Sequence, residues 1–415
     1  MAERRSADVV VVGAGPAGIA AAVHAAEAGA RTLLLDAGAH GGGQIWRHRG
    51  TPPAAARPWL ERLERCAATH LRQAAVIDVA GERSLLVEQD GHALRVDWQR
   101  LVLATGARER FLPFPGWTLA GVLGAGAAQA LLKAGGRFEG SRVVVAGSGP
   151  LLLAVAAALS QAGARVVGIV EQAPLARLLG FAAGLWSRPA KLIEGLGYRL
   201  ATFRAPFEAG AWVTRAEGRE GVERVRVSDG HREWSWECDV LACGYGLVPS
   251  LELPRLLGCA EDERGLVLDD AQQTSLPGVF ACGELGGIGG LDQALVTGAI
   301  AGLSAAGRPL PETLRRARES ERRFARALED AYALREELRS LADPTTLVCR
   351  CEDVARGQLD PAWCSRQAKL YTRAGMGPCQ SRVCGPALGF LFGWGPDAVR
   401  PPLEPTALST LEDET

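Results

Sequence analysis

Two pairs of cysteines near the end of the chain have the residue type and number needed to hold an inorganic cofactor. Cys349 and Cys351 stand in the segment VCRCEDV, and Cys379 and Cys384 stand in GMGPCQSRVCGP. Soft thiolates are the ligands of iron–sulfur centres, and a [2Fe–2S] cluster needs four of them. Zinc is the alternative, but a C-x-C pair with a C-x4-C pair matches the usual zinc spacings poorly. The four cysteines therefore predict a [2Fe–2S] cluster.

A glycine-rich turn near the other end of the chain has the pattern of a dinucleotide-binding site. The apolar segment 8–12 predicts a buried parallel strand, an alanine-rich helix follows it, and a second strand, RTLLLD, ends in an acidic residue. The first glycine permits a tight turn, the second lets a pyrophosphate approach the backbone, and the third lets helix and strand pack closely. The acid can accept hydrogen bonds from ribose hydroxyls. The residues of this predicted site are Gly13, Gly15, Pro16, Ala17, Gly18 and Asp36.

The same pattern recurs between residues 141 and 171. Gly147 and Gly149 match the first two glycines, and Glu171 matches the acid. Leu152 stands where the third glycine would be, and its side chain should push the helix away from the strand. Two interpretations stay open, a retained fold without a ligand and a second nucleotide such as NAD, ADP or ATP. If a ligand binds, Glu171 would repel a 2′-phosphate and favour NAD over NADP.

Composition and charge narrow the class of protein. The length of 415 residues predicts about two to three domains. A net charge of −1 gives no sign of nucleic-acid binding, and no apolar run is long enough to span a membrane. The chain has ten cysteines, and its N-terminal segment is not expected to be a secretion signal. Together these features indicate reduced thiols in a cytoplasmic protein. No acid–base pair, nucleophile elbow or histidine cluster is present, so no catalytic residue is predicted for substrate chemistry.

The segment 311–342 is charged, and its apolar residues recur at helical spacing. It predicts a packing helix that links the nucleotide-binding part to the cysteine-containing part. The tail 401–415 has too little apolar content for a core, so we expect it to be disordered or laid over a neighbouring part.

Taken together, these motifs resemble the flavoproteins with two dinucleotide-binding domains, of the glutathione-reductase and ferredoxin-reductase kind. The segments GGGQIWR, TGARER, GVFACGELGG and VCRCEDV, with the second cysteine pair, look more narrowly like the FAD-containing alpha subunit of heteromeric bacterial amino-acid and opine dehydrogenases. That family includes subunits of opine oxidase, hydrogen cyanide synthase, and proline and hydroxyproline dehydrogenases. The resemblance covers nearly the whole chain.

The resemblance implies an α/β protein in which an FAD domain is split by an NAD-like domain. A small helical domain like bacterioferritin-associated ferredoxin (BFD) would hold the [2Fe–2S] cluster. Twenty-seven residues separate Cys351 from Cys379, fewer than the family pattern, so loss of the cluster is the alternative. The implied domains are 1–118 with 240–310 for FAD, 119–239 for the NAD-like domain, 311–342 for the helical linker, 343–400 for the BFD-like domain, and 401–415 for the tail.

The resemblance also assigns roles to individual residues. The first glycine turn and its acid would bind the ADP half of FAD. Gln44 would hydrogen-bond the edge of the isoalloxazine ring and Arg47 would hold a phosphate. The alternative for either residue is a plain loop position. The other residues implied near FAD are Thr105, Gly106, Gly283 and Glu284, of which the last replaces the more usual aspartate.

The function implied is that of an electron-transfer subunit of a dehydrogenase that oxidises an amino acid, an imino acid or an opine. Substrate oxidation would take place on a partner beta subunit that is itself a flavoprotein of the amino-acid oxidase kind. A small ferredoxin-like [2Fe–2S] gamma subunit is a further candidate partner. The complex would be cytoplasmic or peripheral at the inner membrane. Two alternatives stay open, a stand-alone NAD(P)H-dependent flavin or ferredoxin reductase and a non-catalytic nucleotide-binding scaffold.

Overall fold

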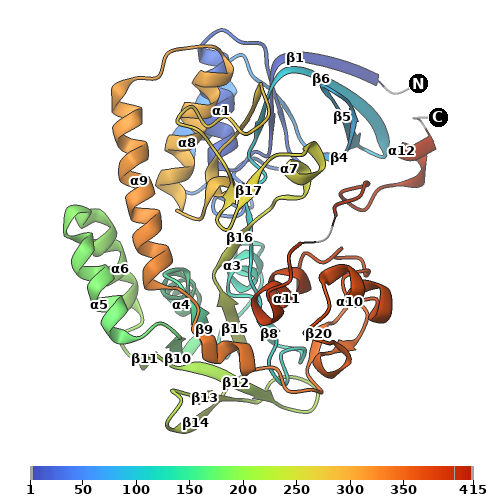
Figure 1. Ribbon diagram of the computed structural model, residues 1–415. Coiled ribbons are helices and arrows are strands. Elements are labelled where there is room, and N and C mark those ends of the chain that lie inside the picture. Colours follow the sequence, from blue (N-terminus) through green and yellow to red (C-terminus); the bar gives the residue numbers. More distant parts are fainter. Residues whose placement is uncertain (1–2, 397, 413–415) are drawn as a thin grey trace. The chain divides into compact units, whose positions relative to one another are not determined.

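In the computed structural model, which describes residues 3–396 and 398–412, the chain divides into two compact units (Figure 1). Unit 1 combines the chain up to Arg108 with Pro249–Arg326 and the tail from Ala398, and unit 2 combines Glu109–Val248 with the segment from Ala327. These limits differ from the predicted domain limits at 118 and 240. The helical linker is divided between the units, and the cysteine-containing module is part of unit 2.

Unit 1 is built on a mixed sheet whose long strand β6 joins a parallel part to an antiparallel part. β1, β2, β3, β6 and β19 are parallel, with β1 at the centre, and β4 and β5 are antiparallel to β6. The strands and helices are β1 (Glu3–Val12), α1 (Pro16–Glu27), β2 (Thr32–Leu35), α2 (Arg57–Arg65), β3 (Thr69–Leu71), β4 (Ala74–Gly81), β5 (Ser84–Gln89), β6 (His92–Leu103), α7 (Glu252–Leu257), β17 (Glu261–Asp262), β18 (Gly265–Leu266), β19 (Val279–Ala281), η2 (Gly283–Gly286), α8 (Leu291–Ala305) and α12 (Leu408–Glu412).

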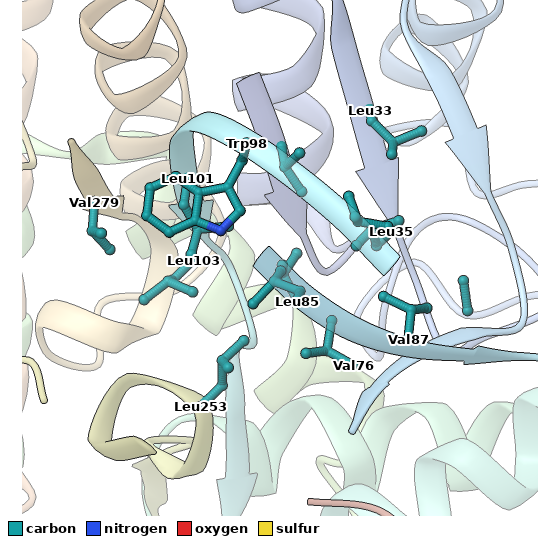
Figure 2. Packing of buried hydrophobic residues seen from close by; sticks show 14 of the residues in the cluster. Leu33, Leu35, Val76, Leu85, Val87, Trp98, Leu101, Leu103, Leu253 and Val279 are labelled. Atoms are coloured by element: carbon teal, nitrogen blue, oxygen red, sulfur yellow. The ribbon is translucent and has the colours of Figure 1, made fainter. Parts of the chain in front are cut away.

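Alternation along the strands gives unit 1 a core on each face of the sheet. Val10 and Val12 of β1 pack into one core, of which Figure 2 labels side chains from β2, β4, β5 and β6. Val9 and Val11 point to the opposite face, which α1 and α8 cover. Because successive side chains of a strand point to opposite faces, the run DVVVV supplies both cores at once.

The two covering helices approach each other closely because of two glycines. A Cβ on Gly298 would lie 2.2 Å from the carbonyl oxygen of Ala17, and one on Gly302 would lie 2.2 Å from that of Ala21. No larger residue fits at either position of α8 without separating the helices. This contact keeps the first turn of α1 beside the segment that leads into α8.

Unit 2 contains a five-stranded parallel sheet in the order β11-β10-β9-β15-β8 and a three-stranded antiparallel sheet, β12-β13-β14. One core lies between the parallel sheet and helices α3 and α4, and another lies between the two sheets. The elements are β8 (Val122–Leu123), α3 (Ala125–Lys133), β9 (Arg142–Ser148), α4 (Leu151–Gln161), β10 (Arg165–Glu171), α5 (Leu175–Gly184), η1 (Leu185–Ser187), α6 (Pro189–Ala201), β11 (Phe207–Ala209), β12 (Trp212–Glu217), β13 (Arg224–Ser228), β14 (Glu233–Glu237) and β15 (Val240–Tyr245).

A small module at the C-terminal end of unit 2 carries the four cysteines of the predicted cluster. Its core includes Val348, Leu359, Leu388 and Trp394. The indole nitrogen of Trp117 donates a hydrogen bond to the carbonyl oxygen of Leu347 (2.6 Å), which ties the module to the rest of unit 2. Its elements are η3 (Glu336–Ser340), β20 (Leu347–Cys349), β21 (Val354–Ala355), η4 (Arg356–Gln358), α10 (Ser365–Thr372) and α11 (Cys384–Phe392).

Three elements lie where the chain passes between the units, namely β7 (Ala107–Glu109), β16 (Leu247–Pro249) and α9 (Glu312–Ala331). The helix predicted over 311–342 is shorter than expected, because α9 ends at Ala331 and residues 332–335 are not helical. The carbonyl groups of Tyr332 and Ala333 accept hydrogen bonds from Gln172 instead of continuing the helix. No described helix has both the length and the apolar content needed to cross a membrane.

The part of the tail that the structure describes is laid over unit 1. The backbone nitrogen of Leu403 donates to the carbonyl oxygen of Ile77 (2.8 Å), and the Ser409 hydroxyl donates to that of Gly91 (3.1 Å). Leu403 is buried in the core that contains Trp98. Residues 401–412 therefore agree with the expectation that the tail is laid over a neighbouring part of the protein.

Candidate functional site

The predicted dinucleotide residues of unit 1 meet at one edge of its sheet. β1, β2, β6 and β19 are parallel, so their carboxyl ends lie together. Gly13 follows β1, Asp36 follows β2, and Thr105 and Gly106 lie just beyond β6. Gly283, which begins η2, lies just beyond β19. This is the edge at which open parallel sheets bind ligands.

The glycine turn between β1 and α1 has the shape that its sequence predicts. Gly13 has a φ of +103°, and a Cβ on it would lie 2.3 Å from the carbonyl oxygen of Ala104. A Cβ on Gly18 would lie 1.7 Å from the carbonyl oxygen of Gly13, so the helix contacts the turn directly. Gly15 differs from both, because a Cβ there would meet no atom of the described residues within 4 Å. The first and third glycines are needed by the fold, whereas Gly15 leaves space at the N-terminus of α1, where a phosphate would be stabilised.

Asp36 is held by backbone groups and remains partly exposed. Its carboxylate accepts hydrogen bonds from the backbone nitrogens of Ala14 and of Gly38, the latter at 2.6 Å. A carboxylate offers about four lone-pair sites, so two remain for ribose hydroxyls.

The loop GGGQIWR lies against the glycine turn. The backbone nitrogen of Gly42 donates to the carbonyl oxygen of Ala14 (2.7 Å), and a Cβ on Gly43 would lie 3.0 Å from the Cα atom of Gly15. The predicted residues Gln44 and Arg47 are exposed on this loop. Trp46, which was not among the predicted site residues, is buried, and its indole nitrogen has no hydrogen-bond partner among the described residues. A buried N–H of this kind suits an acceptor on a bound ligand.

His70 is a second residue that the motifs did not single out. It lies in β3 beside β2, and a Cβ on Gly41 would lie 3.4 Å from its ring. Burial lowers the pKa of His70, so its imidazole is neutral at pH 7, and its Nε2 atom has no partner among the described residues. The ring can therefore exchange a hydrogen bond with a ligand beside Asp36. The sequence offered no signal for it, because a lone histidine in a strand matches no motif.

The remaining predicted residues of unit 1 are partly engaged by the protein itself. The Thr105 hydroxyl donates to the carbonyl oxygen of Ser250 (2.8 Å), whereas a Cβ on Gly106 would meet no atom within 4 Å. The backbone nitrogen of Gly283 donates to the Thr297 hydroxyl (2.9 Å). The Glu284 carboxylate accepts hydrogen bonds from the backbone nitrogens of residues 289 and 290, at 2.7 and 3.0 Å. Glu284 therefore shapes the turn into α8, and burial raises its pKa.

The second glycine turn, in unit 2, repeats the first with one difference. Gly147 has a φ of +132° and would place a Cβ 1.8 Å from the carbonyl oxygen of Gly244, and Gly149 has open space around its Cα atom. Leu152, at the position of the third glycine, is buried in the core between the sheet and α4. In unit 2 the leucine side chain packs into the core. At the equivalent position of unit 1, Gly18 contacts the backbone of Gly13 instead.

The acid of the second turn is far less accessible than Asp36. The carboxylate of Glu171 accepts from the backbone nitrogens of Gly149 (2.8 Å) and Ala173 (2.9 Å), and the residue is 3% exposed. Residues 332–335 lie over this edge of the sheet. The Ser148 hydroxyl donates to the carbonyl oxygen of Tyr332 (3.1 Å), and the side-chain oxygen of Gln172 accepts from the backbone nitrogen of Arg335 (3.1 Å). The chain itself covers the place where a ribose would reach Glu171.

Burial of Glu171 has a consequence for stability that can be measured. Burial raises its pKa from 4.5 to about 7, so the folded chain binds a proton that the unfolded chain has released between these pH values. The contribution of Glu171 to stability is therefore greatest below pH 4.5 and falls as the pH rises to about 7, by on the order of 3 kcal/mol. We expect thermal unfolding of Glu171→Gln to lose this part of the pH dependence. Equal slopes for the variant and the parent chain between pH 5 and 8 would contradict the assignment.

The four predicted cluster cysteines come together in the C-terminal module. The Cys384 thiol is within hydrogen-bonding contact of Cys349 and of Cys379, and Cys379 is in contact with Cys351. The β20–β21 hairpin supplies the first pair, and the turn into α11 supplies the second. Two cysteine pairs with 27 residues between them therefore place four sulfur atoms at one site.

The turn that carries the second pair is tightly constrained. Gln380 and Ser381 both have positive φ values, of 47° and 66°, which non-glycine residues adopt rarely. A Cβ on Gly377 would lie 2.3 Å from that of Cys351, so only glycine permits this approach. Such local strain is found where a surrounding structure fixes the backbone at a ligand site.

The electrostatic surroundings favour thiolates at two of the four positions. The hydrogen bond from Cys384 lowers the pKa of Cys349 to about 6 and that of Cys379 to about 5, with backbone N–H groups acting in the same direction. No three His, Cys, Asp or Glu side chains of the described residues are placed to share a single metal ion. A [2Fe–2S] cluster makes a different demand, because its four thiolates are divided between two iron atoms. Cys364 is exposed at the start of α10.

Comparison with known proteins gives matches along the whole chain. A family model described as pyridine nucleotide-disulphide oxidoreductase matches residues 7–302. An opine oxidase subunit of Rhizobium meliloti is 33% identical, with 98% of each chain covered. The hydrogen cyanide synthase subunit HcnB of Pseudomonas aeruginosa is also 33% identical, with 90% of each chain covered. These relatives confirm the resemblance that the motifs predicted.

Solved structures share the fold. An L-proline dehydrogenase from P. horikoshii aligns with a TM-score of 0.71 at 20% identity, covering 98% of this chain and 79% of that one. A thioredoxin reductase from T. acidophilum aligns with a TM-score of 0.58 at 24% identity, covering 73% of this chain and 98% of that one. The predicted α/β fold with dinucleotide-binding domains and a C-terminal helical region is therefore confirmed.

Proposed function

Because the chain belongs to the pyridine nucleotide-disulphide oxidoreductase family, and its relatives are named as subunits of oxidoreductases, we propose that it is an electron-transfer subunit with FAD in unit 1 and a [2Fe–2S] cluster in unit 2. The complex would oxidise an amino acid, an imino acid or an opine. The observation that carries the proposal is the meeting of four thiols in a chain that also has an open glycine turn for a dinucleotide.

The residues of unit 1 fit the ADP half of FAD. Gly15 leaves room for a pyrophosphate at the N-terminus of α1, and Asp36 has lone pairs left for the ribose. The ring nitrogens of Trp46 and His70, which have no hydrogen-bond partner among the described residues, would supply polar contacts, and Gly106 would leave backbone space beyond β6. Membership of the family implies FAD binding, and these residues are the ones we expect to hold it. Bound FAD would supply an acceptor for two electrons that can also release them singly.

The donor set of the C-terminal module fits a [2Fe–2S] cluster. Cys349, Cys351, Cys379 and Cys384 supply the four thiolates. Backbone N–H groups of residues 381 and 383 point at Cys379, and those of residues 352 and 375 point at Cys349. Hydrogen bonds to the sulfur atoms, together with solvent exposure, set the potential of such a cluster. The role of this chain is to fix the sulfur positions and to limit their contact with water.

Substrate chemistry would take place on another subunit. We propose as partners an amino-acid-oxidase-like flavoprotein beta subunit and a small ferredoxin-like [2Fe–2S] gamma subunit, in a cytoplasmic complex. The relatives, which are named as subunits of opine oxidase and of hydrogen cyanide synthase, support a multi-subunit enzyme. Co-expression with an amino-acid-oxidase-like neighbour gene, followed by a screen of glycine, proline, hydroxyproline and opines, tests this part of the proposal. A chain that remains alone and a mixture that oxidises none of these donors would refute it.

A stand-alone NAD(P)H-dependent reductase is the first alternative, and the second dinucleotide site argues against it. Glu171 is buried, residues 332–335 lie over the same edge, and Leu152 replaces the third glycine. A nicotinamide nucleotide would have to displace the chain from this edge before it could bind.

We therefore expect NADH to reduce the purified chain poorly. Under argon, dithionite should bleach the flavin absorbance completely, whereas NADH or NADPH at the same concentration should leave it nearly unchanged on the time scale of mixing. Stopped-flow absorbance measures both reactions on one preparation. Rapid bleaching by NADH would favour the reductase alternative, and a colourless preparation would favour the non-catalytic scaffold.

A further inference from the structure

Helices α5 and α6 of unit 2, which are drawn in green in Figure 1, are apolar and yet bury no residue. They are joined by η1, which is also without a buried residue. Along this segment every large apolar side chain of the exposed set has more than half of its surface accessible, and Trp186 reaches 87%. The set, which includes a phenylalanine two residues beyond α6, consists of Leu175, Leu179, Trp186, Ile193, Leu196, Leu200 and Phe203, which we call the hairpin patch.

The hairpin patch is a regular feature of the two helices. Ile193, Leu196 and Leu200 recur at helical spacing on one face of α6, whose other side packs against α4. Leu175 and Leu179 are four positions apart on α5, which is anchored by a ring contact between Phe181 and Tyr332 (5.7 Å). The helices are thus attached to unit 2 on one side and apolar on the other. Large apolar side chains that are exposed along one segment of unit 2 mark an interaction site.

The charges around the hairpin patch have one predominant sign. Residues 175–204 contain five arginine and lysine residues and a single acidic residue, although the whole chain has a net charge of −1. The acidic residue, Glu194, is engaged by the Lys191 ammonium (3.4 Å) and the Tyr198 hydroxyl (2.9 Å). Basic charge is therefore concentrated where the apolar side chains are exposed.

We propose that the hairpin patch docks onto the surface of an anionic lipid bilayer. Exposed leucine and isoleucine side chains on two helices, with an exposed tryptophan in η1, an exposed phenylalanine after α6, and arginine and lysine beside them, have the composition of segments that lie in the membrane interface. The apolar side chains would enter the region below the headgroups, and the basic side chains would contact anionic headgroups. Charge complementarity favours this occupant, because an anionic leaflet supplies both an apolar layer and negative charge. The inference goes beyond the proposed function and stands whether or not the chain carries a cofactor.

Vesicle flotation with the full-length chain tests the proposal. The parent chain should float with vesicles of phosphatidylglycerol mixed with phosphatidylcholine, and should remain at the bottom of the gradient with phosphatidylcholine alone. The double variant Leu196→Ser/Leu200→Ser should bind the anionic vesicles at least about tenfold more weakly. It lacks the two leucine side chains whose transfer from water into the bilayer would stabilise binding. Raising the salt concentration should also release the parent chain.

Two further measurements make the result specific. Leu370→Ser in α10 is the matched control, since Leu370 is 69% exposed in the same unit but lies outside the hairpin patch, and it should float like the parent chain. The fluorescence change on adding vesicles should be a blue shift that Trp186→Phe removes. A parent chain that does not float with anionic vesicles would overturn the proposal. So would a double variant that floats normally but no longer co-purifies with a companion subunit, since the patch would then bind protein.

Discussion

Replacing Cys351 by serine should abolish the visible absorbance of an iron–sulfur cluster and leave the chain folded. Cys351 is exposed, so the substitution removes a sulfur ligand without opening a cavity in the module core. A serine oxygen is a harder donor than a thiolate and suits iron–sulfur chemistry poorly. After anaerobic reconstitution, iron and acid-labile sulfide should both fall by about tenfold or more, because ligand changes affect metal retention at least as strongly as changes around the ligands.

The matched control is Cys364→Ser. Cys364 is exposed in the same module and is not one of the four converging thiols, so this variant should keep the iron and sulfide content of the parent chain. Equal iron in the Cys351→Ser and parent chains would exclude the assigned ligand set. Stoichiometric zinc without sulfide in the parent chain would show that the site holds zinc.

The second large effect is expected at Gly15. Its φ of −72° and ψ of 179° are open to any residue, and a Cβ there would meet no protein atom within 4 Å. Gly15→Val should therefore fold, but the added side chain would occupy the space that a pyrophosphate needs at the N-terminus of α1. We expect FAD affinity to fall by about 5- to 150-fold, which corresponds to an overpacking cost of about 1–3 kcal/mol.

Gly18→Val provides the comparison that separates binding from folding. A Cβ on Gly18 would overlap the carbonyl oxygen of Gly13, so this variant should lose stability as well as FAD. Flavin content after purification and the thermal midpoint of the FAD-free protein measure the two effects independently. A Gly15→Val chain that retains a full complement of FAD would show that the flavin does not use this turn.

Local patterns in the sequence determined the elements and most of the ligand edge. The run DVVVV predicts β1 because alternate valines can fill a core on each face of the sheet. The spacing of Gly13 and Gly18 predicts the turn because both glycines follow β1 within a few residues. Each makes a backbone contact that a Cβ atom would prevent. The cysteine pairs predict a common site by their residue type alone, although the turn geometry that brings them together spans two distant segments.

Other features were decided only when distant segments packed together. Asp36 and Glu171 follow the same motif, yet one is partly exposed and the other is covered by residues 332–335, which the helical spacing predicted as part of a helix. His70 stands in no motif, and Trp46 lies in the segment GGGQIWR without being one of its predicted site residues. Each has a buried ring nitrogen without a hydrogen-bond partner among the described residues.

The sequence by itself determined which residue types recur at helix, strand and turn spacing, because those preferences act between near neighbours along the chain. Only the tertiary structure decided which of these surfaces are covered. Burial depends on the segment that folds over a residue, and that segment can lie far away in the sequence. Glu171 is buried because residues 332–335 lie over it. The hairpin patch is exposed to solvent because no described segment covers it.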